Sequence, residues 1–583
     1  MEWDIIKGLT FRTSGTVQYN VNKYNTYTIA WYDGAESSAS VSKNESYTYM
    51  WDNTLNYVNT WKKHSLVGLV GFSIEKYESD GLKASGSGFP DDQVLTNLNS
   101  AAKKNSISSS YSSNTLASFL SRLEYKFNNR YLLTLNFRAD GSSQFGPDKR
   151  WGYFPSGAVA WIITEENFMK DYSNIVSYLK LRGSVGKTGS QNLGAYDWRT
   201  LMGSATYNGA AGIVPSSLGN DILQWEEQIQ KEVGLDYGFW DDRIRGTLGY
   251  YQKKVDNLLY SDPVPTSSSF SSVYQNIGSL KNRGIEFDVR VDIIKNVQKD
   301  LTWNVDFNIA RNRTTLEKLN SSDGYFGGGA YDYFKIEEGG ETGRFYGYKD
   351  AGRLFMTNEE LVGLKTIDPK TGTLKYYRDD YNYERQGDVY IMDLDGDGQI
   401  TADGDRTVIG NANPDFFGGF GSTLYWKGLM LNAVFSYSVG GDRFWDEEKN
   451  SSGDMNVYNT SNRILDSWTV NPGVNASYPR AMYYGWGSNS IITDRYIHDA
   501  SYLRMTALNL SYRLPKHLYK NSILNAVEFT FQATNLFTWT KYPGMDPQGN
   551  FSTTYSAFYN MGIDYSTYPS ARTYNFGIKL TLK

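Results

Sequence analysis

Apolar and polar side chains alternate along most of this chain of 583 residues. In the segment 574–582 every second residue is apolar, namely Phe576, Ile578, Leu580 and Leu582. The same period of two recurs at 303–309, 429–437 and 527–534. A period of two places one apolar row and one polar row on opposite faces of a β-strand. We therefore predict an all-β protein.

Short turns and long loops alternate between the predicted strands, which include 9 to about 23, 45–60, 65–79, 118–127 and 131–140. Tight turns fall at 62–64 and 128–129. Long loops are expected from 24 to about 44, from 80 to about 115, and near 186–222, 256–277, 318–412, 439–500 and 540–570. This rhythm predicts about 17 antiparallel strands of a transmembrane barrel, with short periplasmic turns and long extracellular loops. Helix is expected only at Glu165–Asp171 and Pro515–Lys520. A soluble sandwich with its apolar rows inside is the alternative.

Amino-acid composition bears on the choice between a transmembrane barrel and a soluble sandwich. Aromatic residues make up 15% of the chain and include 47 Tyr, which would suit the aromatic girdles of a membrane barrel or a carbohydrate-binding surface. The absence of cysteine excludes a disulfide framework. A net charge of −5 does not suggest the positively charged surface that a nucleic-acid-binding protein needs. Residues 1–6 lack the pattern of an export signal, so we expect either that the chain is not a membrane barrel or that the front of a longer barrel protein is missing.

Several short sequence motifs occur one after another along the chain. The longest is Tyr131 to Trp161, which contains the runs DGSS at 140–143 and WGYFPS at 151–156. Others stand at 179–186, 281–286, 345–348, 393–398, 409–411, 501–504, 535–538 and 568–573. Together they resemble the SusC/RagA-type, TonB-linked (TonB-dependent) outer-membrane transporters over nearly the whole chain.

The resemblance implies a barrel of about 22 strands with a plugged lumen. Residues 1–583 would be a single partial barrel domain, its C-terminal part, with a large extracellular loop at about 318–412 and without the plug. It further implies import of glycans or peptides across the bacterial outer membrane and no enzyme activity. The expected partners are a SusD-like surface lipoprotein, the TonB complex through the missing N-terminal part, and outer-membrane lipid.

Two other functions stay open at this point. A soluble β-rich carbohydrate-binding or glycan-cleaving protein would be extracted without detergent. A passive porin-like barrel would conduct without TonB. The segregation of short turns and long loops favours a barrel over the soluble protein, but the sequence does not decide between an importer and a porin.

An acidic turn is the candidate metal site. Asp393, Asp395 and Asp397 alternate in a glycine-containing turn, like the first positions of an EF-hand calcium loop. Gly404 stands where the usual bidentate acid would be, and a one-residue insertion would bring in the neighbouring acid. The candidate ligands are Asp393, Asp395, Asp397, Gln399 and Asp405. No cofactor is required, and a bound Ca²⁺ would be structural; a turn without an ion is the alternative.

Catalytic chemistry finds little support. His64, His498 and His517 are the three histidines, and neither metal spacing nor a nucleophile elbow accompanies them. We interpret Glu286 and Asp288 as lumen-facing charges rather than a glycosidase pair.

Loop aromatics are candidates for ligand binding, with packing between loops as the alternative for each. They are Tyr331, Tyr333, Tyr484, Trp486, Tyr555 and Phe558.

Overall fold

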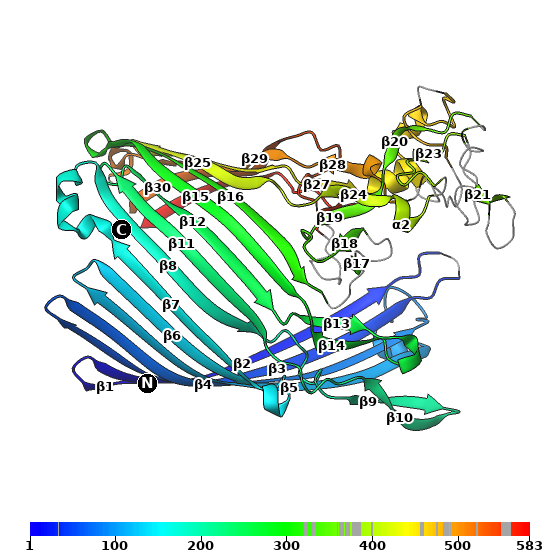
Figure 1. Cartoon of the computed structure of the whole chain (residues 1–583), viewed down its shortest axis with the longest axis horizontal. Helices are drawn as coiled ribbons and strands as arrows, with labels where there is room; N and C mark the ends of the chain where they lie inside the picture. The colour runs from blue at the N-terminus through cyan, green and yellow to red at the C-terminus, as the bar shows by residue number, and fades with distance from the viewer. Residues whose placement is uncertain are drawn as a thin grey trace. The chain divides into compact units, whose positions relative to one another are not determined.

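The protein is described by a computed structural model covering residues 1–32, 34–319, 325–327, 333–357, 360, 366–367, 374–375, 386–397, 400–454, 460–473, 476–481, 489, 491–520, 523–549 and 561–582. Within this part of the chain, 17 strands belong to one sheet, which confirms the predicted number and fold class (Figure 1). None of the described helices is long and apolar enough to cross a membrane.

The strands of this sheet are β1 (Glu2–Ile6), β2 (Leu9–Thr28), β3 (Ser38–Trp61), β4 (His64–Ser87), β5 (Lys103–Phe127), β6 (Tyr131–Ser142), β7 (Trp151–Ile162), β8 (Val176–Ser190), β11 (Glu226–Phe239), β12 (Ile244–Asp256), β15 (Ser279–Asn296), β16 (Leu301–Lys318), β25 (Phe416–Trp426), β26 (Leu429–Val439), β29 (Tyr502–Arg513), β30 (Leu524–Thr540) and β32 (Thr573–Leu582).

The chain divides into two compact units. The first comprises Met1–Asp171, Leu179–Gly234 and Gln252–Ser279; the second comprises Tyr172–Tyr178, Leu235–Tyr251 and Leu280–Lys583. The prediction of a single partial domain stays a prediction.

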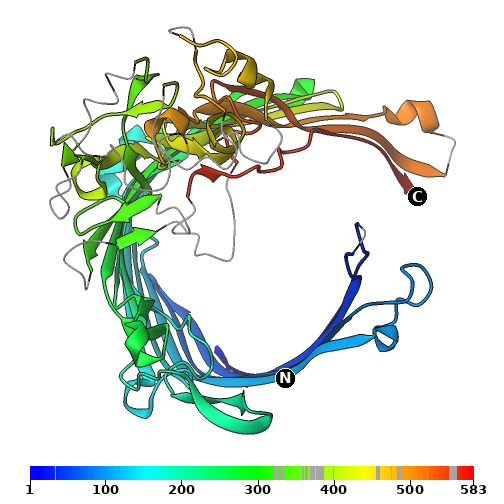
Figure 2. The same ribbon diagram turned by 90° about the vertical axis from the view of Figure 1, so that its right-hand side faces the viewer.

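In the first unit, β1 to β8 pair antiparallel in sequence order. Seen end on, these strands form one curved layer, drawn in blue to cyan (Figure 2). Strands β2 to β5 are 20 to 25 residues long. Residues 24–28, 38–44 and 103–115, which we expected in loops, are therefore largely strand. Their serine-rich sequence pairs through the backbone and through cross-strand contacts such as Ser85 Oγ to Ser106 Oγ at 2.8 Å.

The tight turns have the backbone that two-residue hairpins require. Lys62, Asn128 and Asn129 have φ of 52°, 51° and 57°, in the left-handed region. The remaining elements of this unit are η1 (Leu98–Ser100), η2 (Pro147–Lys149), η3 (Ile163–Glu165), η4 (Asn167–Tyr172), β9 (Leu201–Tyr207), β10 (Ala210–Ser217), β13 (Leu259–Pro263), η5 (Thr266–Ser268) and β14 (Ser272–Asn276). Helix was predicted at Glu165–Asp171, and the structure has two 3₁₀ turns there.

In the second unit, β16, β25, β26, β29, β30 and β32 pair antiparallel in that order. Its other elements are η6 (Val297–Lys299), β17 (Tyr325–Gly327), β18 (Phe334–Ile336), β19 (Arg344–Tyr348), β20 (Asp350–Leu354), β21 (Thr366–Ile367), β22 (Leu374–Lys375), β23 (Val389–Ile391), α2 (Ala402–Asp405), β24 (Arg406–Asn411), β27 (Asp442–Trp445), α3 (Asp446–Glu448), η8 (Lys449–Asp454), η9 (Asn462–Asp466), η10 (Asp494–Tyr496), β28 (Ile497–Asp499), η11 (Lys516–Tyr519) and β31 (Ile563–Asp564). The helix predicted at Pro515–Lys520 is the 3₁₀ turn η11.

The loops have cores of their own. In the second unit, Phe345, Phe444 and Tyr496 are buried together in one cluster, and Leu354 and Phe355 in another. These clusters fix the loops that β16–β25 and β26–β29 enclose, so the loop conformation does not depend on the strands alone.

Candidate functional site

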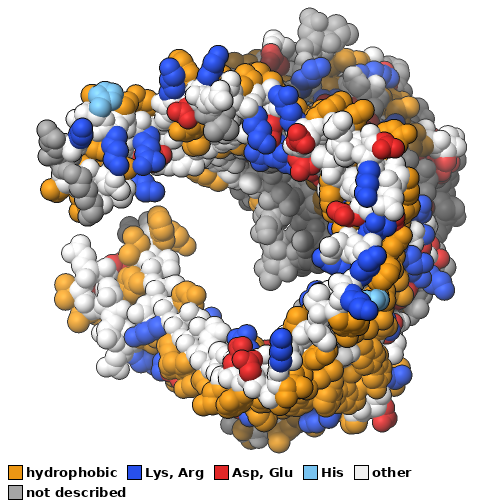
Figure 3. Space-filling view, turned by 90° about the vertical axis from the view of Figure 1, so that its left-hand side faces the viewer, with side chains coloured by type: hydrophobic (Ala, Val, Ile, Leu, Met, Phe, Trp, Pro, Cys, Tyr) orange, Lys and Arg blue, Asp and Glu red, His pale blue; other side chains and the backbone are white. Residues whose placement is uncertain are grey.

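The first unit presents an apolar face and a polar face. Cross-strand register places Leu55, Val70, Ser121 and Phe137 in one row. Val70 and Phe137 remain 54% and 44% exposed in the isolated chain, and Leu55 is half-buried. Figure 3 shows hydrophobic side chains gathered along one side of this sheet. Such a face fits lipid.

A row of aromatic rings borders the apolar face at the short-turn end. Trp61, His64, Phe127, Tyr131 and Trp161 follow one another in register across β3 to β7. Neighbouring rings lie close, with the Trp61 and His64 centroids 5.4 Å apart. We call this row the periplasmic girdle, because short turns of such barrels lie on the periplasmic side.

A second group of rings lies toward the long loops. The Tyr19 and Tyr47 rings stack at 4.6 Å, and the Tyr49 ring lies 6.1 Å from that of Tyr47. Trp51 lies on the same face of β3 as Tyr47 and Tyr49 and is 53% exposed, so it marks the near edge of this second group. From Trp61 to Trp51 the strand advances about 33 Å, which a tilt of about 40° reduces to the ~25 Å of an apolar barrel band. The face between the two aromatic groups therefore has the height of a bilayer core.

The opposite face of the first unit is polar and ion-paired. Arg138 Nε lies 2.8 Å from Asp140 Oδ2, and Arg138 Nη2 donates to Ser118 Oγ at 2.9 Å. Arg182 pairs with Glu232. A face of this kind suits a water-filled lumen.

The second unit repeats the arrangement without charges in its central row. A ladder of amide and hydroxyl side chains crosses six strands in register: Asn304, Thr423, Asn432, Asn509, Gln532 and Asn575. Asn509 Nδ2 donates to Asn432 Oδ1 and Asn432 Nδ2 to Thr423 Oγ1, both at 2.9 Å. The alternation predicts each strand's polar positions, but only the register shows that they form one row.

Asp288 and Asp292 of β15 join side-chain networks along that strand. Arg245 Nη1 lies 3.1 Å from Asp292 Oδ2, Arg290 Nε lies 3.8 Å from Asp292 Oδ1, and Asp288 accepts from Thr247 Oγ1. These contacts are compatible with charges that face the lumen, and that orientation of Glu286 and Asp288 stays a prediction.

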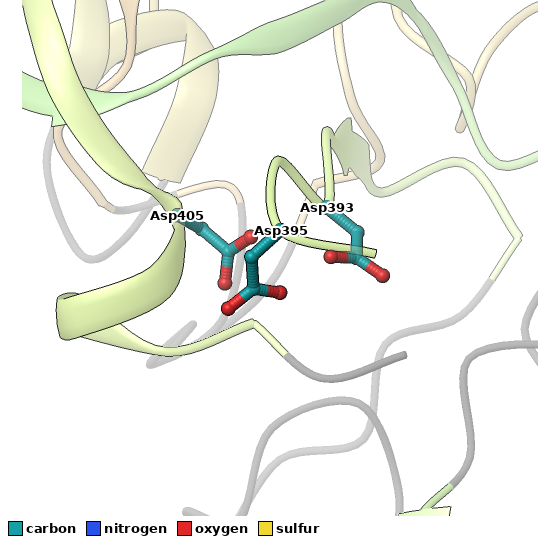
Figure 4. Close-up of side chains that lie close together, drawn as sticks. All are labelled: Asp393, Asp395 and Asp405. Carbon is teal, nitrogen blue, oxygen red and sulfur yellow. The ribbon is translucent and has the colours of Figure 1, made fainter. Parts of the chain in front are cut away.

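Three carboxylates of the predicted metal site converge in the second unit. One oxygen from each of Asp393, Asp395 and Asp405 lies within 4.8 Å of the others (Figure 4). The acid expected through a one-residue insertion, Asp405, is thus in the cluster, whereas Asp397 is not. Gln399 lies outside the described residues.

Backbone contacts hold the cluster in place. Asp405 is fully buried, and its carboxylate accepts the N–H groups of Leu394 and Thr401, both at 2.7 Å. Asp393 Oδ1 accepts the N–H of Gly396 at 2.7 Å. A Cβ at Gly404 would lie 2.2 Å from Asp395 Oδ2, which explains why glycine rather than an acid occupies that position.

Electrostatics disfavour three charges here without a cation. The N–H of Asp397 lowers the pKa of Asp395, but desolvation, the charges of Asp397 and Asp405, and a hydrogen bond with Asp393 together raise it above its ordinary value. Oxygens on opposite sides of a Ca²⁺ ion stand at most about 5 Å apart. The carboxylate spacing therefore fits a hard cation, which would need further oxygen ligands.

Of the aromatic ligand-binding candidates, Tyr333 is described. It is 4% exposed, its hydroxyl donates to Asp446 Oδ1 at 2.8 Å, and its ring meets that of Phe444 edge-on at 4.9 Å. In this conformation it packs a loop core and offers little surface, and a role in binding stays a prediction. Tyr331, Tyr484, Trp486, Tyr555 and Phe558 lie outside the described residues.

Two of the three histidines, His64 and His498, take part in packing and polar contacts. His64 Nδ1 lies 2.7 Å from the Tyr125 hydroxyl, in the periplasmic girdle. His498 Nε2 lies 2.6 Å from Glu448 Oε2, and Arg463 Nη1 also lies 2.6 Å from that carboxylate. This ionic cluster of the loops was missed in the sequence, because its members stand 15 to 50 residues apart.

Comparison with known proteins identifies the class. The model for the TonB-dependent receptor-like β-barrel matches residues 2–536. The chain therefore belongs to the TonB-dependent receptor β-barrel family, and it is of the SusC/RagA type within the bacterial outer membrane. The predicted family, the barrel fold and the outer-membrane location are confirmed. Membership of this family excludes the alternative of a soluble β-rich protein.

Individual relatives agree with this family assignment. TonB-dependent receptor P3 of Formosa agariphila is 31% identical over 99% of this chain and 57% of its own length. The TonB-dependent receptor SusC of Bacteroides thetaiotaomicron is 32% identical over 80% of this chain and 44% of its own length. The solved RagAB peptide transporter superposes with a TM-score of 0.80 at 26% identity, covering 99% of this chain and 60% of that one. The chain thus spans about half the length of these curated relatives.

Proposed function

We propose that this chain is the barrel wall of a TonB-dependent importer, which carries oligomeric nutrients, glycans or peptides, across the outer membrane. The two-faced sheet carries this proposal, because it places a bilayer-high apolar face opposite a polar, hydrogen-bonding face. The relatives are named as receptors and a transporter, and they support import rather than an enzyme activity.

The whole protein would act with partners. A SusD-like surface lipoprotein would cover the extracellular loops, and the TonB complex would drive import. The solved RagAB structures are named for a peptide transporter and importer, which favours peptides among the two ligand classes, although their identity of 26% leaves glycans open.

Purification of the whole tagged protein from native outer membranes tests the assignment. We expect one surface lipoprotein in stoichiometric amount and a bound pool of short peptides or oligosaccharides, identified by mass spectrometry. A passive porin-like barrel would come without the lipoprotein and without a retained pool, and that result would overturn the proposal.

We also propose that Asp393, Asp395 and Asp405 hold a structural Ca²⁺. Its role would be to fix the turn before α2, with no part in bond chemistry. Calcium titration should raise the melting temperature of the wild type, and Asp395→Asn should remove most of that rise. Asp403→Asn, an exposed acid on α2, is the matched control. Equal responses of the two variants would contradict the site.

The pH dependence follows from the raised pKa of Asp395. Without a cation, the stability that its neutral form provides is lost as pH rises through this pKa, because the charged form is disfavoured in the folded state. Ca²⁺ binds the charged form, so its apparent affinity should fall as pH falls through the same pKa. An affinity independent of pH across this interval would contradict the ligand assignment.

A further inference from the structure

The apolar face of the first unit is interrupted by a groove of about 450 Å³. Apolar side chains line it, including those of Leu55, Leu135 and Phe137, and the small residues Gly68 and Ser121 line it as well. A Cβ added at Gly68 would meet no atom within 4 Å. Gly68 stands between Tyr57 and Leu123 in one register row, and Ser121 between Val70 and Phe137 in the next. The groove therefore lies where a small residue interrupts each of two neighbouring rows of large ones.

The groove lies in the periplasmic half of the apolar band. Gly68 stands four residues from His64 of the periplasmic girdle, about 13 Å along the strand and ~10 Å in height. The turn that precedes His64 carries Lys62 and Lys63, both exposed. Arg130, in the next turn, pairs with Glu166 at 2.9 Å. The groove and the basic turn thus lie along the same strands, with the periplasmic girdle between them.

We propose that this groove and the Lys62–Lys63 turn form a binding site for one phospholipid of the periplasmic leaflet. An acyl chain lies in the groove, and the phosphate lies beside the two lysines. The groove is continuous with the lipid interface of an outer-membrane barrel, so lipid is the occupant. This inference rests on the membrane location and not on the proposed import activity.

Two effects would select this lipid from its neighbours. Lipid tails are as apolar as leucine, so burial of area gives no preference, and selection must come from close packing and from charge. The groove adds contacts on several sides of a chain, where a flat face offers contacts on one. Each lysine near the surface favours an anionic lipid about fivefold.

Photocrosslinking tests the site directly. The whole protein is reconstituted in nanodiscs with phosphatidylglycerol that carries a diazirine in mid-chain, and labelled residues are mapped by mass spectrometry. We expect labels concentrated on the groove residues of β4, β5 and β6. Labels spread evenly over the apolar face of β2 to β7 would overturn the proposal, and this wild-type map is decisive even if a variant fails to fold.

Variants with matched controls separate the two parts of the site. Gly68→Phe fills the groove and should abolish the concentrated labelling, whereas Gly15→Phe, on the same face and equally open, should not. Lys62→Glu with Lys63→Glu should reduce labelling by the anionic probe at least about tenfold. Lys427→Glu, in the exposed turn between β25 and β26, is its control. Unchanged labelling in both site variants would refute the site.

Discussion

An arginine placed on the apolar face should destabilise the protein, whereas an arginine one residue away should not. Leu135 is 44% exposed on the apolar face, and Thr134 lies on the polar face directly opposite Glu124. Leu135 stands four residues from Tyr131 of the periplasmic girdle, so it lies ~10 Å inside a band ~25 Å tall, close to its middle. Arginine at this depth costs about 2–4 kcal/mol on a lipid face.

Equilibrium unfolding in guanidinium, with the whole protein folded into phospholipid vesicles, measures this cost. Leu135→Arg should lower the free energy of unfolding by about 2–4 kcal/mol. Thr134→Arg should change it by less than about 1 kcal/mol, because its guanidinium enters the lumen beside a carboxylate. If Thr134→Arg costs as much as Leu135→Arg, or more, the assignment of the two faces is refuted.

Other predictions concern the extracellular side. Arg504 and Asp546 form a buried ion pair at 2.5 Å, so Arg504→Ala should lower the free energy of unfolding by about 3–5 kcal/mol and speed hydrogen exchange at 541–549. Arg513→Ala, on the exposed end of β29, is the control and should have neither effect. Unchanged exchange at 541–549 in Arg504→Ala would contradict this prediction. Burial raises the pKa of Asp442, with a further rise from Asp499 opposite it, against the hydrogen bond from the Asn411 N–H. The stability that neutral Asp442 provides is therefore lost as pH rises through that pKa, and Asp442→Asn should exceed the wild type in melting temperature at pH 8 but not at pH 4. An equal difference at both pH values would argue against this reading.

The sequence predicts which face of a strand a residue lies on better than it predicts which residues of different strands lie in one cross-strand row. Alternation at 303–309 and 527–534 correctly separates the apolar from the polar positions of two strands. It does not show that Asn304 and Gln532 belong to the same ladder, because a period of two leaves the register undetermined. The periplasmic girdle was missed for the same reason, since its five rings come from five strands.

Local composition gives a wrong prediction of secondary structure where pairing with neighbouring strands determines it. The serine-rich residues 103–115 read as a loop, yet they extend β5, because neighbouring strands satisfy their backbone groups. In the predicted metal turn, Asp405 lies in the carboxylate cluster, as a one-residue insertion would place it, whereas Asp397 lies outside it. The turn geometry around Gly404 decides this, and motif spacing does not contain it. Tyr333 was chosen for its type, and the loop core that buries it is formed by residues far along the chain.

The import claim is tested most directly by uptake in cells that lack the chromosomal gene for the whole protein. Fluorescent peptide and oligosaccharide pools are supplied, and periplasmic accumulation is measured with the whole protein restored, in the presence and absence of TonB. We predict that one of the pools accumulates only when both the protein and TonB are present. Accumulation that depends on the protein but not on TonB would show a passive pore and contradict the proposed function.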